Sequence, residues 1–123
     1  MSEAAKSLRL WRLAHAATTS DVVPALQGHA RYQALMVARV LAAAAREAEL
    51  GAEFERLELQ GIEALIVHPV PSLEAARAAL CREIASGRFD AAGPERDALL
   101  AHLALTNENR LRITNPKALE GEP

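Results

Sequence analysis

Two strong helix formers dominate this sequence: 27 of its 123 residues are alanine and 18 are leucine. Alanine and leucine have high helix propensities, whereas strands favour β-branched and aromatic residues. Aromatic residues make up only 3% of the chain, and no segment alternates apolar and polar residues as a strand does. The composition therefore predicts an all-α protein. A hydrophobic content of 50% excludes a disordered chain.

Capping residues, glycines and prolines divide the chain into about five helices. The segment Thr18–Asp21 is expected to end the first helix and to provide a new N-cap. Gly51 is expected to separate the second helix from the third, and Ser72 is expected to cap the fourth. Short connections favour an antiparallel bundle, so we expect one helical domain over residues 1–123, with a flexible tail at about 118–123. The predicted helices are Leu8–Ala17, Gly28–Leu50, Ala52–Val67, Leu73–Ser86 and Pro94–Thr114.

Apolar residues within these helices recur at helical spacing. The long second helix carries an apolar stripe that lines one of its faces. The single cysteine, Cys81, excludes a disulfide scaffold and lies in an amphipathic pattern, which favours a small core residue over a nucleophile. The stripe includes Tyr32, Leu35, Met36, Val40 and Ala43.

Charge is distributed unevenly along a chain whose net charge is −2. Residues 1–46 contain six basic and two acidic side chains, whereas residues 47–63 contain six acidic side chains and one basic. Two interpretations stay open: the solvated faces of neighbouring helices that attract one another, or a partner that docks across the basic part. A nucleic-acid partner is not expected, because a strong basic excess is missing.

The expected location rests on two stretches of the chain. The longest purely apolar run, Val40–Ala45, is far shorter than a membrane span. The segment Met1–Lys6 is polar, and no apolar region of a signal peptide comes after it. We expect a cytoplasmic protein that does not enter a membrane.

The residue types that carry catalysis do not occur in recognisable patterns. No two histidines are spaced as metal ligands on one helix, and no Glu-x-x-His pair is present. The six glycines are scattered singly, so they form no phosphate-binding loop. We expect no catalytic residue, no metal site and no cofactor, and therefore no enzyme.

Two basic segments could meet a partner. Arg31 lies in the first turn of the long helix, where the helix dipole does not favour a cation. It should therefore have a partner, either a carboxylate of this fold or a bound anion or acidic protein surface. Basic residues from Arg110 to Lys117 lie near a helix C-terminus, where the dipole favours them. Alternatively, they form a basic edge that meets a phosphate-bearing ligand or a partner.

Three segments, taken in order, resemble a family of small all-helical bacterial proteins of unknown function. Members of that family accompany aminoglycoside-phosphotransferase-like kinases in acyl-CoA catabolism, and the family includes the small subunit of the 4-hydroxyacyl-CoA kinase of levulinate-type pathways. The family has Asn where Arg39 stands here and Lys where Arg110 stands. The segments are Pro24-Ala25-Leu26 with Gly28-x-Ala30-Arg31-Tyr32, then Leu80-Cys81-x-x-Ile84-x-x-Gly87-x-x-Asp90, then Leu99-Leu100-x-His102-Leu103-x-x-Thr106 with Leu111-x-Ile113-x-Asn115-Pro116.

The resemblance implies a non-catalytic accessory subunit that stabilises or completes a kinase acting on hydroxyacyl-CoA. Such a subunit should expose a larger apolar patch than a monomer usually does. Two alternatives are a self-associating helical bundle, in which a homo-oligomer buries the patch, and a protein that holds an acyl ligand. The candidate interface residues are Trp11, Arg31, Tyr32, Arg110, Asn115 and Lys117.

Overall fold

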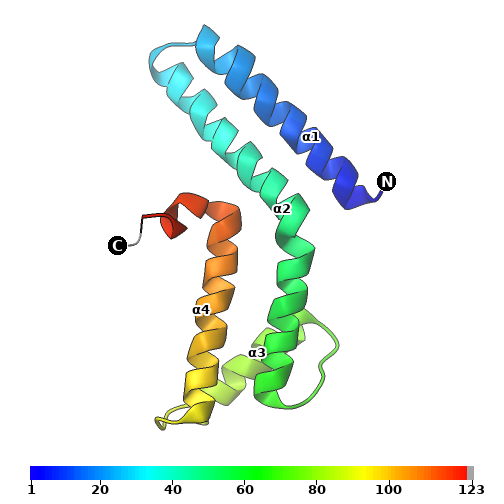
Figure 1. The fold of residues 1–123 in the computed structure, drawn as a ribbon, viewed down its shortest axis with the longest axis vertical. Helices are drawn as coiled ribbons and strands as arrows, with labels where there is room; N and C mark the ends of the chain where they lie inside the picture. Colours follow the sequence, from blue (N-terminus) through cyan, green and yellow to red (C-terminus); the bar gives the residue numbers. More distant parts are fainter. Residues whose placement is uncertain (122–123) are drawn as a thin grey trace. The chain divides into compact units, whose positions relative to one another are not determined.

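The computed structural model describes residues 1–121, and every regular element in that part of the chain is a helix (Figure 1). The predicted all-α class is confirmed, and four long helices are close to the five expected. Across residues 1–121, none of these helices combines the length and the apolar character that a membrane span requires. The α-helices are α1 (Glu3–Ala17), α2 (Gly28–Ile66), α3 (Leu73–Ala85) and α4 (Pro94–Thr114); the short helices are η1 (Thr18–Val22), η2 (Val23–Ala25) and η3 (Pro116–Leu119).

The described residues form two compact units. We call the unit made of Met1–Ala52 and residues 112–121 the hairpin unit, and the unit made of Glu53–Leu111 the core unit. The expected single domain stays a prediction. Of the expected flexible tail, residues 122–123 lie outside the described part, while Pro116–Leu119 forms the 3-10 helix η3.

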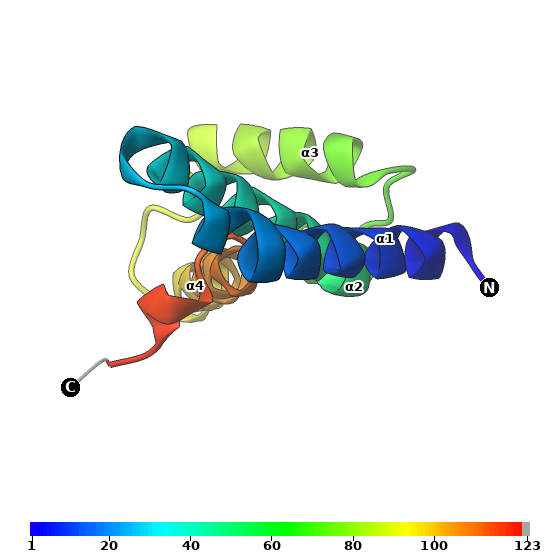
Figure 2. The same cartoon turned by 90° about the horizontal axis from the view of Figure 1, so that it is seen from above.

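In the hairpin unit, α1 runs beside the first half of α2 (Figures 1 and 2). The hydroxyl of Ser2 caps α1 by accepting a hydrogen bond from the backbone N–H of Ala5, at 3.1 Å. The predicted cap at Thr18–Asp21 is wrong. The Thr18 hydroxyl instead donates back to the carbonyl of Ala14 at 2.8 Å, and the segment from Thr18 continues as a turn of π-helix. Serine and threonine often satisfy a preceding carbonyl in this way rather than opening a new helix.

The predicted break at Gly51 is also wrong, because α2 continues through it to Ile66. A glycine that ends a helix usually adopts a positive φ. Gly51 does not; it is buried inside the helix. The cost of a glycine within a helix is about 1 kcal/mol, which packing readily offsets.

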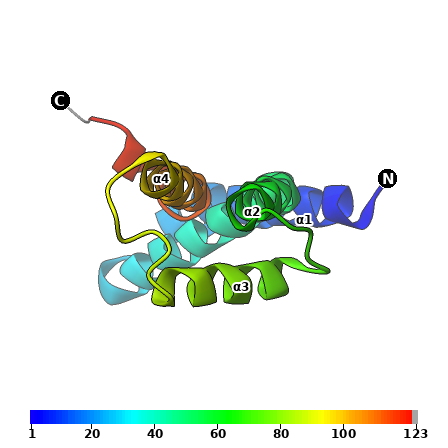
Figure 3. The ribbon, with the colours of Figure 1, turned by 90° about the horizontal axis from the view of Figure 1, so that it is seen from below.

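In the core unit, α3 packs across α2 and α4 (Figure 3). The Ser72 hydroxyl caps α3, as predicted, by accepting a hydrogen bond from the N–H of Ala75 at 3.1 Å. Gly87 comes after α3 with a φ of 88°, which only glycine adopts without strain. The buried core consists of Ile62, Leu65, Ile66, Ala76, Ala79, Leu80, Phe89 and Leu99.

Several apolar residues of the core unit lie on its surface. Cys81 is exposed, so the prediction that it is a core residue is wrong. The buried positions of α3 are Ala76, Ala79 and Leu80, and the residue after Leu80 is rotated away from them by the helical turn. On α4, Leu99 is buried, whereas Leu100 and Leu103 are exposed.

Candidate partner-binding face

The first half of α2 has two different apolar sides. One side is made of the small residues Ala34, Ala38 and Ala45, which are all buried. Glu49 lies one helical turn after Ala45 on that side, and its carboxylate pairs with the guanidinium of Arg12 on α1, at 3.2 Å. The helix α1 therefore covers the alanine side of α2.

The other side of this half carries large apolar residues that stay exposed among residues 1–121. Tyr32, Met36 and Val40 are spaced four apart and form one row along the helix, with exposed fractions between 41% and 66%. Leu35 and Val37 lie in the two neighbouring rows and are 44% and 50% exposed. We call these five residues the α2 apolar face. Isolated exposed apolar residues are ordinary, but a contiguous apolar patch usually marks an interaction site.

Four residues of the apolar stripe predicted from the sequence are thus exposed to solvent, and the fifth, Ala43, is half-buried. Alanines can bring the backbones of α1 and α2 close together, whereas larger residues would hold the two helices apart. A hairpin of two helices can also cover only one side of α2. The sequence signal for the exposed side is therefore the set of alanines at positions 34, 38 and 45, which marks where α1 packs.

Positive charge lies along one edge of the α2 apolar face. Arg31 and Arg39 occupy the same row as Leu35, one turn before it and one turn after it. Neither arginine has an ion-pair partner among residues 1–121. The carboxylate of this fold that Arg31 was expected to meet is thus not among the described residues. At the start of the face, the rings of His29 and Tyr32 stack with their centres 6.4 Å apart.

All six candidate interface residues are exposed, but they are not gathered in one place. Only Arg31 and Tyr32 lie together, at the α2 apolar face. Helical spacing predicted Met36 and Val40 as part of the stripe but did not identify them as interface residues. The hairpin unit contains Trp11, Arg31, Tyr32, Asn115 and Lys117, whereas Arg110 belongs to the core unit.

Comparison with known protein families adds one finding. The model of DUF6285, a domain of unknown function, matches residues 24–118. The chain belongs to the DUF6285 family. The matched DUF6285 region contains the whole of α2, including its apolar face, but not α1. No curated protein and no solved structure matches the chain.

Two polar clusters of the DUF6285 region outside this face are engaged in structural contacts. The Glu58 carboxylate of α2 accepts two hydrogen bonds from Arg77 of α3, both at 2.7 Å. These bonds hold the pKa of Glu58 below its usual value, although burial opposes the shift, and the charges of Arg110 and His102 add to the lowering. This pair ties α3 to α2 and presents no free group to a substrate.

His102 forms a second polar contact inside the core unit. Its ring on α4 lies directly against the backbone of Gly61 on α2, where a Cβ atom would collide with the ring nitrogen Nδ1. The other nitrogen, Nε2, is 3.5 Å from the Thr106 hydroxyl. Burial lowers the pKa of His102, and the charge of Glu58 partly offsets this effect. Gly61 therefore allows α4 to pack closely on α2.

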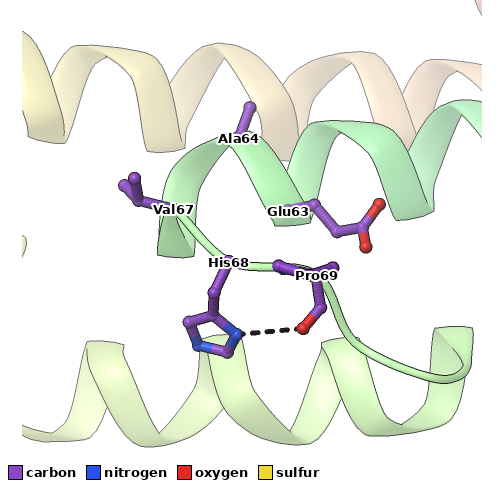
Figure 4. Close-up of a pocket in the computed structure, with 5 residues that line it drawn as sticks. All are labelled: Glu63, Ala64, Val67, His68 and Pro69. Atoms are coloured by element: carbon purple, nitrogen blue, oxygen red, sulfur yellow. Dashed lines mark hydrogen bonds between the residues drawn. The ribbon is translucent and has the colours of Figure 1, made fainter.

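A hollow of about 430 Å³ lies where α2 ends, lined by Glu63, Ala64, Val67, His68 and Pro69 (Figure 4). Its polar groups are engaged with nearby backbone: Glu63 accepts a hydrogen bond from the Val70 N–H at 3.0 Å. His68 Nδ1 lies 3.2 Å from the carbonyl oxygen of Pro69. Among residues 1–121, no three metal-ligating side chains are grouped as a metal site would need. The α2 apolar face is therefore the strongest candidate site of the DUF6285 region.

Proposed function

We propose that this chain is a non-catalytic subunit that binds a second protein through the α2 apolar face. The observation that carries the proposal is the exposure of Tyr32, Met36 and Val40 in one row, while α1 covers only the opposite side of the helix. Covering such a row removes apolar surface from water, which is the main favourable contribution to most protein association.

We further propose that the second protein is an aminoglycoside-phosphotransferase-like kinase that phosphorylates hydroxyacyl-CoA. The support for this partner is the resemblance of the three segments between Pro24 and Pro116 to the family that accompanies such kinases. In this proposal the kinase carries the catalytic groups, and this chain stabilises the kinase or completes its substrate site. The cytoplasmic location and the candidate interface residues outside the α2 apolar face stay predictions.

The proposal is tested by producing the chain together with an aminoglycoside-phosphotransferase-like kinase from the same organism. Size-exclusion chromatography with light scattering would show whether a complex forms, and phosphorylation of a hydroxyacyl-CoA would be measured with and without this chain. We expect a complex, and a kinase that is less stable or less active alone. A kinase that is fully active and soluble alone, and that neither binds nor responds to this chain, contradicts the proposal.

A pair of matched variants locates the interface. Met36→Glu places a charge in the centre of the α2 apolar face and should weaken the complex by about tenfold or more. Ala16→Glu places the same charge at an exposed position of α1, outside the face, and should leave the complex unchanged. Equal effects of the two variants would show that the kinase binds elsewhere.

A further inference from the structure

The charges beside the α2 apolar face restrict what can cover it. Arg31 and Arg39 flank Leu35 in the row next to Tyr32, Met36 and Val40. The row on the other side contains Gln33 and Val37 and has no charge. A partner that covers the apolar row therefore meets two cations along one edge and none along the other.

These two arginines have no carboxylate of their own to pair with. Residues 22–46 contain no Asp and no Glu, and neither arginine has an ion-pair partner among residues 1–121. When a partner removes water from the edge of the face, an unpaired guanidinium loses hydration without compensation. The covering surface must supply acceptors for the guanidinium groups, and carboxylates do so best, because they match the planar fork of arginine.

A second copy of this chain does not meet that requirement at the same face. Each copy brings the same stretch without acidic residues, so two faces placed together would contain four arginines of this kind and no carboxylate. Like charges across an interface oppose association. The charge pattern therefore favours a different protein over self-association.

An anionic membrane is the other surface that could take an apolar row edged by cations. Helices that bind acidic lipids typically use clusters of roughly four to eight Lys or Arg residues. They also carry a strongly charged face opposite the apolar one. Here the edge has two arginines, and the opposite side of α2 consists of buried alanines under α1. The face thus fits a protein better than a lipid surface.

We infer that the α2 apolar face binds a protein whose apolar side chains are bordered along one edge by carboxylates, which pair with Arg31 and Arg39. The inference rests on the proposed function only in taking this face as the docking site. It specifies the chemistry of the partner and does not depend on the partner's being a kinase.

A pair of synthetic amphipathic helices tests the inference with the full-length chain. Both helices carry the same row of leucines; glutamates flank the row in one helix and lysines flank it in the other. We expect the glutamate helix to bind about tenfold more tightly, with an affinity that falls as salt is added. The double variant Arg31→Glu/Arg39→Glu should reverse the preference, and Met36→Glu should abolish binding of both helices.

Three results would overturn the inference. The first is no preference between the two helices, including no binding by either. The second is a dimer of the chain, seen by light scattering, that Met36→Glu dissociates. The third is binding to phosphatidylserine-containing vesicles that Met36→Glu abolishes.

The kinase experiment separates this inference from the proposed function. If the helices discriminate as expected but no kinase binds, the proposed kinase partnership fails and the inference stands. If a kinase binds through Met36 and the Arg31→Glu/Arg39→Glu variant binds it equally well, the inference fails and the partnership stands.

Discussion

The hairpin unit and the core unit differ in where their large apolar side chains lie. The core unit buries large side chains such as Ile62, Leu80 and Phe89, which are between 1% and 5% exposed. In the hairpin unit, the buried residues of α2 are alanines and Gly51, and the five large residues of the α2 apolar face are exposed. The helix α2 belongs to both units. Large apolar side chains such as Ile62 and Ile66 are buried in its second half, whereas the α2 apolar face in its first half is exposed.

This difference indicates which part of the chain depends on another molecule. Burial of large apolar side chains contributes about 1.5–3 kcal/mol each, so the core unit has an internal source of stability. Within the hairpin unit, α1 has no buried residue, and the buried residues of α2 are small. The apolar surface that could stabilise this unit further faces outward, where the proposed partner would cover it.

The largest expected effect contrasts Ile62→Ala with Met36→Ala. Ile62 is 1% exposed, and its truncation leaves a cavity in the core unit, so the free energy of unfolding should fall by about 2–5 kcal/mol. Met36 is exposed in the free chain, so Met36→Ala should change that free energy by less than about 0.5 kcal/mol. Chemical denaturation of both variants measures the two values. A similar loss in both would show that the hairpin unit also depends on its large side chains in the free chain.

Local signals in the sequence were sufficient for the start of α3 and for both ends of α4. The helix α4 spans Pro94–Thr114, which are the bounds predicted from the sequence; a proline opens it and another lies just beyond its end. The cap at Ser72 is also confirmed. Each of these depends on the conformation or hydrogen bonding of one or two residues, so each can be predicted without knowledge of distant contacts.

Features that depend on contacts between distant residues could not be predicted from local sequence signals. Helical spacing placed Tyr32, Met36 and Val40 on one side of a helix, but it did not indicate whether another element would cover that side. Gly51 was predicted to end a helix because glycine readily adopts the conformation of a helix end. In the structure Gly51 is buried and α2 continues through it. Arg31 was recognised as needing a partner, whereas its isolation from carboxylates became visible only once the fold was known.

A smaller effect separates the two units through their helical glycines. A Cβ atom at Gly61 would collide with the ring of His102, so Gly61→Ala should destabilise the core unit by about 1–3 kcal/mol. A Cβ atom at Gly51 would meet only the carboxylate end of Glu47, which is flexible and can move away. Gly51→Ala should therefore stabilise α2, by up to about 1 kcal/mol, because alanine favours helix.

Thermal unfolding of the two glycine variants gives the comparison directly. We expect opposite signs, with a lower midpoint for Gly61→Ala and an unchanged or higher midpoint for Gly51→Ala. A gain in both would show that α4 can shift away from α2 at little cost. The core unit would then be packed no more tightly than the hairpin unit.

The smallest expected effect is a dependence of stability on pH that arises in the core unit. Burial lowers the pKa of His102 from its ordinary value of 6.5, so the folded chain binds this proton less readily than the unfolded chain does. The resulting stability is fully present above pH 6.5 and is lost as the pH falls through that value toward the lower pKa of the folded chain. The charge of Glu58 attracts the protonated ring and limits the loss. Thermal midpoints should thus fall more between about pH 7.5 and 5.5 for the wild type than for His102→Gln, which cannot titrate. A pH dependence in His102→Gln as steep as that of the wild type would contradict this assignment.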